Sequence, residues 1–196
     1  AARAFLLAVR EHVDVMVLET GLGGRLDATN IVVPAVSAIV KIGLDHCDWL
    51  GDSVAKISLE KAGIIKTSVP IVLGANESSV RDLIESKARE KNAPFFYAPD
   101  FTDETEIPSG FSLGGKFNRE NALTAISVLK ILEEKNISPD IKFSLEALTR
   151  VFWPGRFHVI GRFLVDGAHN PPAASALVQS LTDKMTVIAG FCSDKA

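Results

Sequence analysis

The stretch Ile71–Tyr97 reads IVLGANESSVRDLIESKAREKNAPFFY, and its pattern decides the fold class. It begins after Pro70 with the apolar run Ile71–Leu73, which predicts a buried strand. The charged segment Ser78–Lys91 follows with helical spacing, and Phe95–Tyr97 closes the stretch as a second short strand. The order strand, helix, strand is typical of two parallel strands joined by a crossover helix. The sequence therefore predicts an α/β fold.

The same alternation continues on both sides of this unit. Apolar residues recur every three to four positions in the expected helices and form β-branched runs in the expected strands. These elements are helices at residues 1–12, 52–66 and 118–135 and strands at Val13–Leu18 and Val36–Ile42. We therefore predict a parallel sheet with flanking helices.

A domain boundary is expected near residue 153. The pattern breaks at Trp153-Pro154-Gly155 and restarts as a strand at Phe163–Val165, a helix at Pro171–Leu181 and a strand at Thr186–Ala189. We assign residues 1–153 to one domain and residues 154–196 to the beginning of a Rossmann-like second domain, which is short for a complete one. The sequence also starts without methionine, so we expect that both natural ends lie outside it.

Composition excludes several classes of protein. The chain has 196 residues, 47% of them hydrophobic, and a formal net charge of -3 with scattered lysines and arginines, so nucleic acid is not an expected partner. No apolar stretch approaches the roughly 20 residues that cross a bilayer, so no membrane association is expected. Cys47 and Cys192 are too few for a disulfide framework, which favours a reducing compartment such as the cytoplasm.

The first candidate site follows the run Val13–Leu18. Glu19 ends this run, and open parallel sheets place their chemistry at the carboxyl ends of strands, where a carboxylate can hold a magnesium ion; an exposed glutamate facing water is the alternative. The glycine-rich loop Gly21–Asn30 allows close approach of its backbone to a ligand. Leu26 stands where a dinucleotide fingerprint requires its third glycine, which argues against a nicotinamide cofactor.

His46 and Lys61 are further candidates. His46 follows the second expected strand, which places it at the same edge of the sheet as Glu19, either as a metal ligand or as a hydrogen-bonded structural residue. Lys61 shares a helix face with apolar residues such as Ile57 and Ile64. Either its aliphatic stem lies along the core and its ammonium reaches water, or the ammonium is buried and loses its water. Desolvation lowers the pKa of a lysine, and a neutral amine reacts with carbon dioxide to give a carbamate that can bind magnesium.

Five ordered motifs resemble those of the folylpolyglutamate synthase/dihydrofolate synthase family of the Mur ligase superfamily. They are Val17–Asn30, Gly43–His46, Glu60–Ile64, Trp153–Arg156 and Asp166–Pro171. The resemblance covers nearly the whole chain. It implies a Mur-ligase-type central ATPase domain followed by the start of the C-terminal domain. The family's phosphate-binding loop, of the G-x-x-x-x-G-K-S/T kind, occurs nowhere in the sequence and is expected upstream of it.

The resemblance implies an ATP-dependent ligase that adds L-glutamate to dihydropteroate or a folate through an acyl phosphate. It implies that Glu19 and His46 bind Mg²⁺ and that Lys61 is carbamylated, and these three residues form the expected catalytic group. It further places pterin contacts at Asp27 and Ala28, and ATP contacts at Asn121, Arg156, Asp166 and His169. A departure from the family pattern at Phe117–Ala122 weakens the assignment of Asn121.

Two alternatives stay open. A Mur-type ligase of a cell-wall precursor would use the same chemistry, although the loop Gly21–Asn30 argues against it. A non-catalytic nucleotide-binding module is the other, because the phosphate-binding loop is absent. We expect small-molecule substrates and a monomer, and little turnover from these 196 residues alone.

Overall fold

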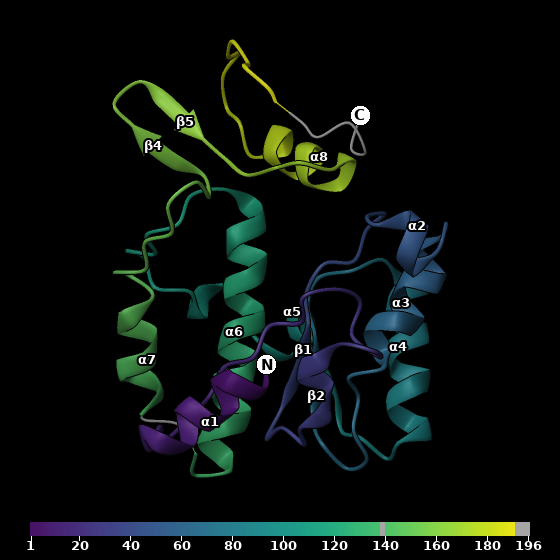
Figure 1. Cartoon of the computed structure of the whole chain (residues 1–196). Coiled ribbons are helices and arrows are strands. Elements are labelled where there is room, and N and C mark those ends of the chain that lie inside the picture. The colour runs from purple at the N-terminus through teal and green to yellow at the C-terminus, as the bar shows by residue number, and fades with distance from the viewer. Residues whose placement is uncertain (138–139, 191–196) are drawn as a thin grey trace.

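The computed structural model describes residues 1–137 and 140–190, which form an α/β structure around a parallel sheet (Figure 1). Its strands are β1 (Ser37–Ile39), β2 (Ile71–Leu73) and β3 (Phe95–Tyr97), in the order β1-β2-β3. Both pairs are parallel, and Ile71 of β2 lies between Ser37 of β1 and Phe95 of β3. The predicted α/β class with a parallel sheet is confirmed.

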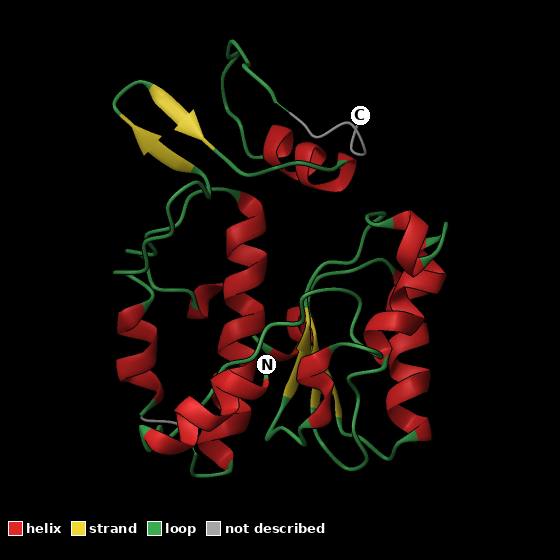
Figure 2. Ribbon diagram, viewed as in Figure 1, coloured by secondary structure: helices red, strands yellow, loops and turns green. Residues whose placement is uncertain are grey.

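Helices cover both faces of this sheet (Figure 2). On one face lie α3 (Val54–Ala62) and α4 (Ser78–Glu90), and on the other lie α5 (Ala98–Phe101) and α6 (Lys116–Glu134). The predicted helices 52–66, 78–91 and 118–135 are therefore present with slightly different ends.

The central strand β2 shows why the sheet needs two helical layers. Ile71 and Leu73 pack into the cluster formed with α3 and α4, whereas Val72 packs on the opposite side with Ala98 and Ile131. Successive side chains of a strand point to opposite faces, and all three in β2 are fully buried. An unbroken apolar run is therefore what this position requires.

The remaining described helices and strands lie outside the sheet and the four helices that cover it. They are α1 (Ala2–Arg10), η1 (Ala28–Ile31), α2 (Cys47–Leu50), η2 (Glu104–Glu106), α7 (Ile141–Ala147), β4 (His158–Ile160), β5 (Phe163–Val165) and α8 (Pro171–Gln179). Strands β4 and β5 form an antiparallel hairpin, which lies with α8 at one end of the molecule (Figure 1). None of the described helices is long and apolar enough to cross a bilayer.

Two predicted strands are wrong. The run Val13–Leu18 forms no strand, and Val17 in it is 92% exposed; Thr186–Ala189 forms none either, and Ile188 is 97% exposed. A β-branched run becomes a strand only when a neighbouring strand pairs with its backbone groups. Within the described residues neither run has such a neighbour. The predicted strand Val36–Ile42 is present but shortened to β1.

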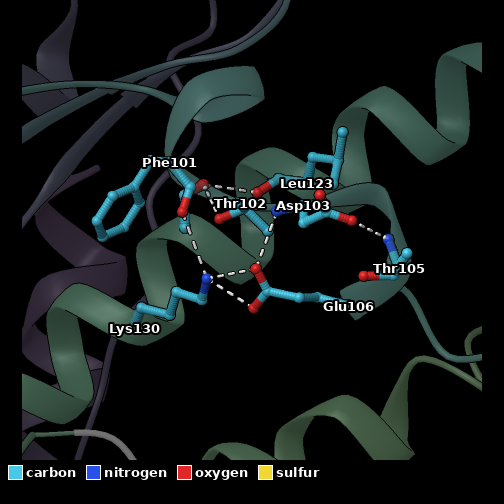
Figure 3. Close-up of polar contacts among 8 residues, drawn as sticks. Phe101, Thr102, Asp103, Thr105, Glu106, Leu123 and Lys130 are labelled. Carbon is cyan, nitrogen blue, oxygen red and sulfur yellow. Dashed lines mark hydrogen bonds and ion pairs between the residues drawn. The ribbon is translucent and has the colours of Figure 1, made fainter.

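Two polar contacts fasten α5 and the segment after it to α6: a buried hydroxyl pair, and the ion pair of Lys130 with Glu106 that Figure 3 shows. The hydroxyl oxygens of Thr102 and Ser127 lie 2.8 Å apart, and Ser127 donates its proton to the carbonyl oxygen of Leu123 at 2.8 Å. Thr102 must therefore donate to Ser127. Nearby, the Lys130 ammonium lies 2.6 Å from a carboxylate oxygen of Glu106, so an ion pair supports the same junction.

Ser127→Ala should lower the free energy of unfolding by about 1–3 kcal/mol, because the buried Thr102 hydroxyl loses its acceptor. Urea unfolding of the purified protein measures this loss. The double variant Thr102→Val/Ser127→Ala should lose less than the sum of the single changes. Ser86→Ala, at an exposed serine of α4, is the control and should change stability by less than about 0.5 kcal/mol. Equal effects of Ser127→Ala and Ser86→Ala would contradict the assignment.

Candidate functional site

A cavity of about 200 Å³ lies beyond the carboxyl end of β1. Its polar lining includes Thr20, Asp45, His46 and Lys61, and Ile57 supplies part of the apolar wall. These residues come from the glycine-rich loop, from the segment after β1 and from α3. Ligand sites in open parallel sheets lie at the carboxyl ends of strands, so the position of this cavity is the expected one.

Lys61 is half-buried in the last turn of α3. One turn earlier, Ile57 is fully buried, so the helix directs this face toward the core. Burial lowers the pKa of Lys61, because the charged ammonium loses water, and the negative charge of Asp45 partly offsets this. At a given pH, Lys61 is therefore a neutral amine in a larger fraction of the molecules than an exposed lysine would be.

His46 reaches the cavity through a left-handed backbone conformation, with φ of 50°. Asp45 holds this turn: its Oδ1 accepts the His46 backbone N–H at 2.8 Å, and its Oδ2 lies 3.8 Å from the imidazole Nε2. Glu19 is exposed and does not line the cavity, although the next residue, Thr20, does. The structure thus brings His46 and Lys61 to one cavity and leaves the Glu19 side chain outside it.

Among residues 1–137 and 140–190, no group of three or more histidine, cysteine, aspartate and glutamate side chains is arranged to hold a metal ion. The ionisable side chains that line the cavity are one imidazole, one carboxylate and one amine, from His46, Asp45 and Lys61. A modified Lys61 or the approach of the Glu19 carboxylate would add oxygen ligands of the kind that Mg²⁺ prefers.

Asp27 folds the glycine-rich loop around its own carboxylate. Its Oδ2 accepts the backbone N–H groups of Gly21 at 2.8 Å and Leu22 at 3.2 Å, and its Oδ1 accepts the N–H and hydroxyl of Thr29 at 2.8 and 2.6 Å. These hydrogen bonds, led by that of the Thr29 hydroxyl, lower the pKa of Asp27 from 3.8 to about 2. Ala28, the next residue, is exposed at the start of η1.

The loop is docked on the end of α3. The backbone N–H of Arg25 donates to the Glu60 carbonyl oxygen at 2.8 Å, and the Arg25 guanidinium lies 2.9 Å from the Glu60 carboxylate. A Cβ on Gly24 would lie 2.8 Å from Ile64, and a Cβ on Gly63 would overlap Arg25. Glycine at both positions therefore permits the close approach that forms one wall of the cavity.

Three of the four predicted ATP contacts lie at the base of the hairpin β4-β5: Arg156 precedes β4, and Asp166 and His169 follow β5. Asp166 accepts the backbone N–H of Phe157 at 2.7 Å, the Arg156 guanidinium lies against Gly167, and Nδ1 of His169 lies 2.8 Å from the Gly167 carbonyl oxygen. The fourth, Asn121, is exposed on α6 and does not belong to this cluster.

Asp45 links the segment that follows β5 to the cavity. Its Oδ2 accepts a hydrogen bond from the Asn170 side-chain amide at 2.8 Å and lies 3.8 Å from Nε2 of His169. The sequence motifs predicted no role for Asp45. The available signal was its position directly before His46 at the end of a strand, where a carboxylate meets residues from other segments.

Known proteins resemble this chain in sequence and in fold. No family model matches the chain. It is 33% identical over 207 residues to dihydrofolate synthase/folylpolyglutamate synthase of Bacillus subtilis, covering 93% of this chain and 48% of that protein. The probable dihydrofolate synthetase of Schizosaccharomyces pombe is 36% identical over 198 residues, which is 91% of this chain and 47% of that protein. A solved FPGS–AMPPCP–folate complex matches with a TM-score of 0.80 at 25% identity, covering 90% of this chain and 49% of that one.

The covered parallel sheet and the cavity at its carboxyl edge define an α/β protein of the Mur-ligase type. The chain belongs to the folylpolyglutamate synthase/dihydrofolate synthase family, as its motifs indicated. It spans about half the length of the curated relatives that it matches.

Asp27→Asn should lower the free energy of unfolding by an amount that depends on pH. Because folding lowers the pKa of Asp27 from 3.8 to about 2, its stabilisation is complete above pH 3.8 and is lost as the pH falls through 2. The wild type should therefore be more stable than Asp27→Asn at neutral pH, and the difference should shrink between those two values. Urea unfolding at several pH values measures it, with Asp14→Asn, at an exposed aspartate, as the control. If the difference in stability between the wild type and Asp27→Asn did not change with pH, the ionised Asp27 carboxylate would not be what stabilises the loop.

Proposed function

We propose that the whole protein is an ATP-dependent ligase that joins L-glutamate to dihydropteroate, a folate or both. The observation that carries this proposal is the similarity to dihydrofolate synthase/folylpolyglutamate synthase over 93% of the chain. The matching solved structure holds AMPPCP and folate, an ATP analogue and a pterin, which supports the same two classes of ligand here.

The proposed reaction has two steps. ATP transfers its terminal phosphoryl group to a carboxylate oxygen of the pterin substrate, which gives an acyl phosphate and ADP. The neutral amine of glutamate then attacks the acyl carbon, phosphate leaves with the C–O bonding electrons, and the nitrogen loses a proton. The first step is needed because a carboxylate oxygen is a poor leaving group. Positive groups near the transferred phosphoryl oxygens stabilise the transition state.

We assign the cation site to the cavity. His46 and a carbamylated Lys61 would hold Mg²⁺ there, with Glu19 turning inward from its exposed position beside Thr20. The lowered pKa of Lys61 supports carbamylation, because only the neutral amine attacks carbon dioxide. Bound there, Mg²⁺ would supply positive charge beside the phosphate oxygens.

The remaining predicted contacts are part of the same proposal. Arg156, Asp166 and His169, which lie together, and Asn121 on α6 would contact ATP. Asp27 would shape the pterin-facing loop, because its carboxylate oxygens already accept backbone N–H groups, and the exposed Ala28 would contact the pterin.

The division into domains 1–153 and 154–196 also remains a proposal. It is supported by the two sheets, one on each side of residue 153: the parallel sheet β1-β2-β3 and the hairpin β4-β5. Limited proteolysis should then cut near Trp153, which is 62% exposed, before it cuts within β2 or α4.

Glutamate-dependent release of ADP tests the function. The whole protein, given magnesium, ATP, L-glutamate and either dihydropteroate or a folate, should release ADP in proportion to new amide bond. The 196-residue chain alone should show little turnover, because its sequence holds no phosphate-binding loop. No glutamate-dependent release with either acceptor would overturn the proposal, and activity with a cell-wall precursor instead would redirect it.

Lys61→Ala should lower kcat by about a hundredfold or more, because the carbamate oxygens are lost from the cation site. Acetate should restore part of the activity by supplying carboxylate oxygens. Lys56→Ala is the matched control, because Lys56 lies in the same helix and is exposed in an ion pair with Asp52. If Lys61→Ala were as active as Lys56→Ala, Lys61 would have no part in the cation site.

A further inference from the structure

The Asp45 carboxylate lies between two segments that are far apart in the sequence. Its Oδ2 accepts a hydrogen bond from the Asn170 amide at 2.8 Å, across 125 positions of the chain. Its Oδ1 accepts the His46 backbone N–H at 2.8 Å. The Asp45 side chain is 26% exposed, and its bond to Asn170 is partly buried, whereas its bond to the His46 N–H is exposed. One carboxylate thus contacts both the cavity segment and the segment that leads into α8.

Asn170 is fixed in the orientation that this contact needs. Its side-chain oxygen accepts the backbone N–H of Ala173 at 2.8 Å and caps α8, so its nitrogen must face Asp45. Beside this contact, Pro172 occupies the space that a side chain on Gly43 would need, since a Cβ there would lie 2.6 Å from the proline ring. The start of α8 is therefore seated directly on the segment that forms the cavity.

His169 is held by the same arrangement. Its Nδ1 lies 2.8 Å from the Gly167 carbonyl oxygen, and its Nε2 lies 3.8 Å from Oδ2 of Asp45. Nε2 of His46 also lies 3.8 Å from this oxygen. His169 directly precedes Asn170, so a displacement of Asn170 would also move His169 relative to Asp45.

We infer that Asp45 is a positioning residue, whose hydrogen bond to Asn170 holds the segment Asp166–Pro171 over the cavity and aligns His169 with His46 and Lys61. This inference rests on the proposed function, because alignment matters there for ATP held by one segment and a cation held by the other. Misplacement of reacting groups by about 1 Å lowers the rate of a reaction strongly even when binding survives.

An exchange of the two side chains tests the inference. Asp45→Asn sets two amide nitrogens against each other, and Asn170→Asp sets two carboxylates against each other. The double variant D45N/N170D restores the bond with its direction reversed. The amide at position 45 keeps its oxygen for the His46 N–H, and the carboxylate at position 170 still accepts the Ala173 N–H. All three hydrogen bonds are then possible again.

Each single variant should lower kcat of the whole protein by about tenfold to a hundredfold, with a smaller change in KM for ATP. The double variant should recover to within about threefold of the wild type. Asp48→Asn, at an exposed aspartate of α2, is the control and should leave kcat unchanged. A double variant no more active than Asp45→Asn would overturn the inference, because the charge at position 45 would then matter, not the bond. A fully active Asn170→Asp variant would overturn it as well.

Thermal unfolding of the wild type, the two single variants and the double variant separates this inference from the proposed ligase function. Each single variant should lower the unfolding midpoint and the double variant should restore it, whether or not the protein turns over. If the wild type releases no ADP, the ligase function is wrong and the unfolding series alone decides the contact. Midpoints that show no recovery in the double variant would overturn the contact itself.

Discussion

The close approach of the glycine-rich loop to the last turn of α3 is the constraint on which the site depends. Gly24 and Gly63 have no Cβ, so the Arg25 backbone N–H can donate to the Glu60 carbonyl oxygen at 2.8 Å. The carboxylate of Asp27 keeps the loop in the shape that makes this docking possible. Without it, one wall of the cavity beside Lys61 would be missing.

The cavity combines two opposing electrostatic effects. Burial favours the neutral amine of Lys61, and the carboxylate of Asp45 favours the ammonium. Burial is the stronger effect, because the pKa of Lys61 is lowered. Asp45 also receives a hydrogen bond from Asn170, so the group that tunes the lysine also connects the two parts of the chain. One carboxylate thus affects both the charge of Lys61 and the contact between the two segments.

Local patterns predicted the fold well and the long-range pairing poorly. The stretch Ile71–Tyr97 forms the strand, helix and strand expected from its periodicity, and its two strands, β2 and β3, pair with each other. Val13–Leu18 and Thr186–Ala189 form no strands, since periodicity does not reveal whether a pairing strand is present. For the site, sequence motifs selected His46 and Lys61, which do share a cavity. The role of Asp45 depends on Asn170, a contact across 125 positions that only the structure shows.

The central claim is that the cavity lined by His46 and Lys61 is the cation site beside bound nucleotide. The most direct measurement is anomalous diffraction from crystals of the whole protein grown with AMPPCP and Mn²⁺, an ion that suits the same oxygen ligands as Mg²⁺. We predict an anomalous peak within coordination distance of His46 and of a carbamylated Lys61. A peak elsewhere, or nucleotide bound with no peak in this cavity, would contradict the account.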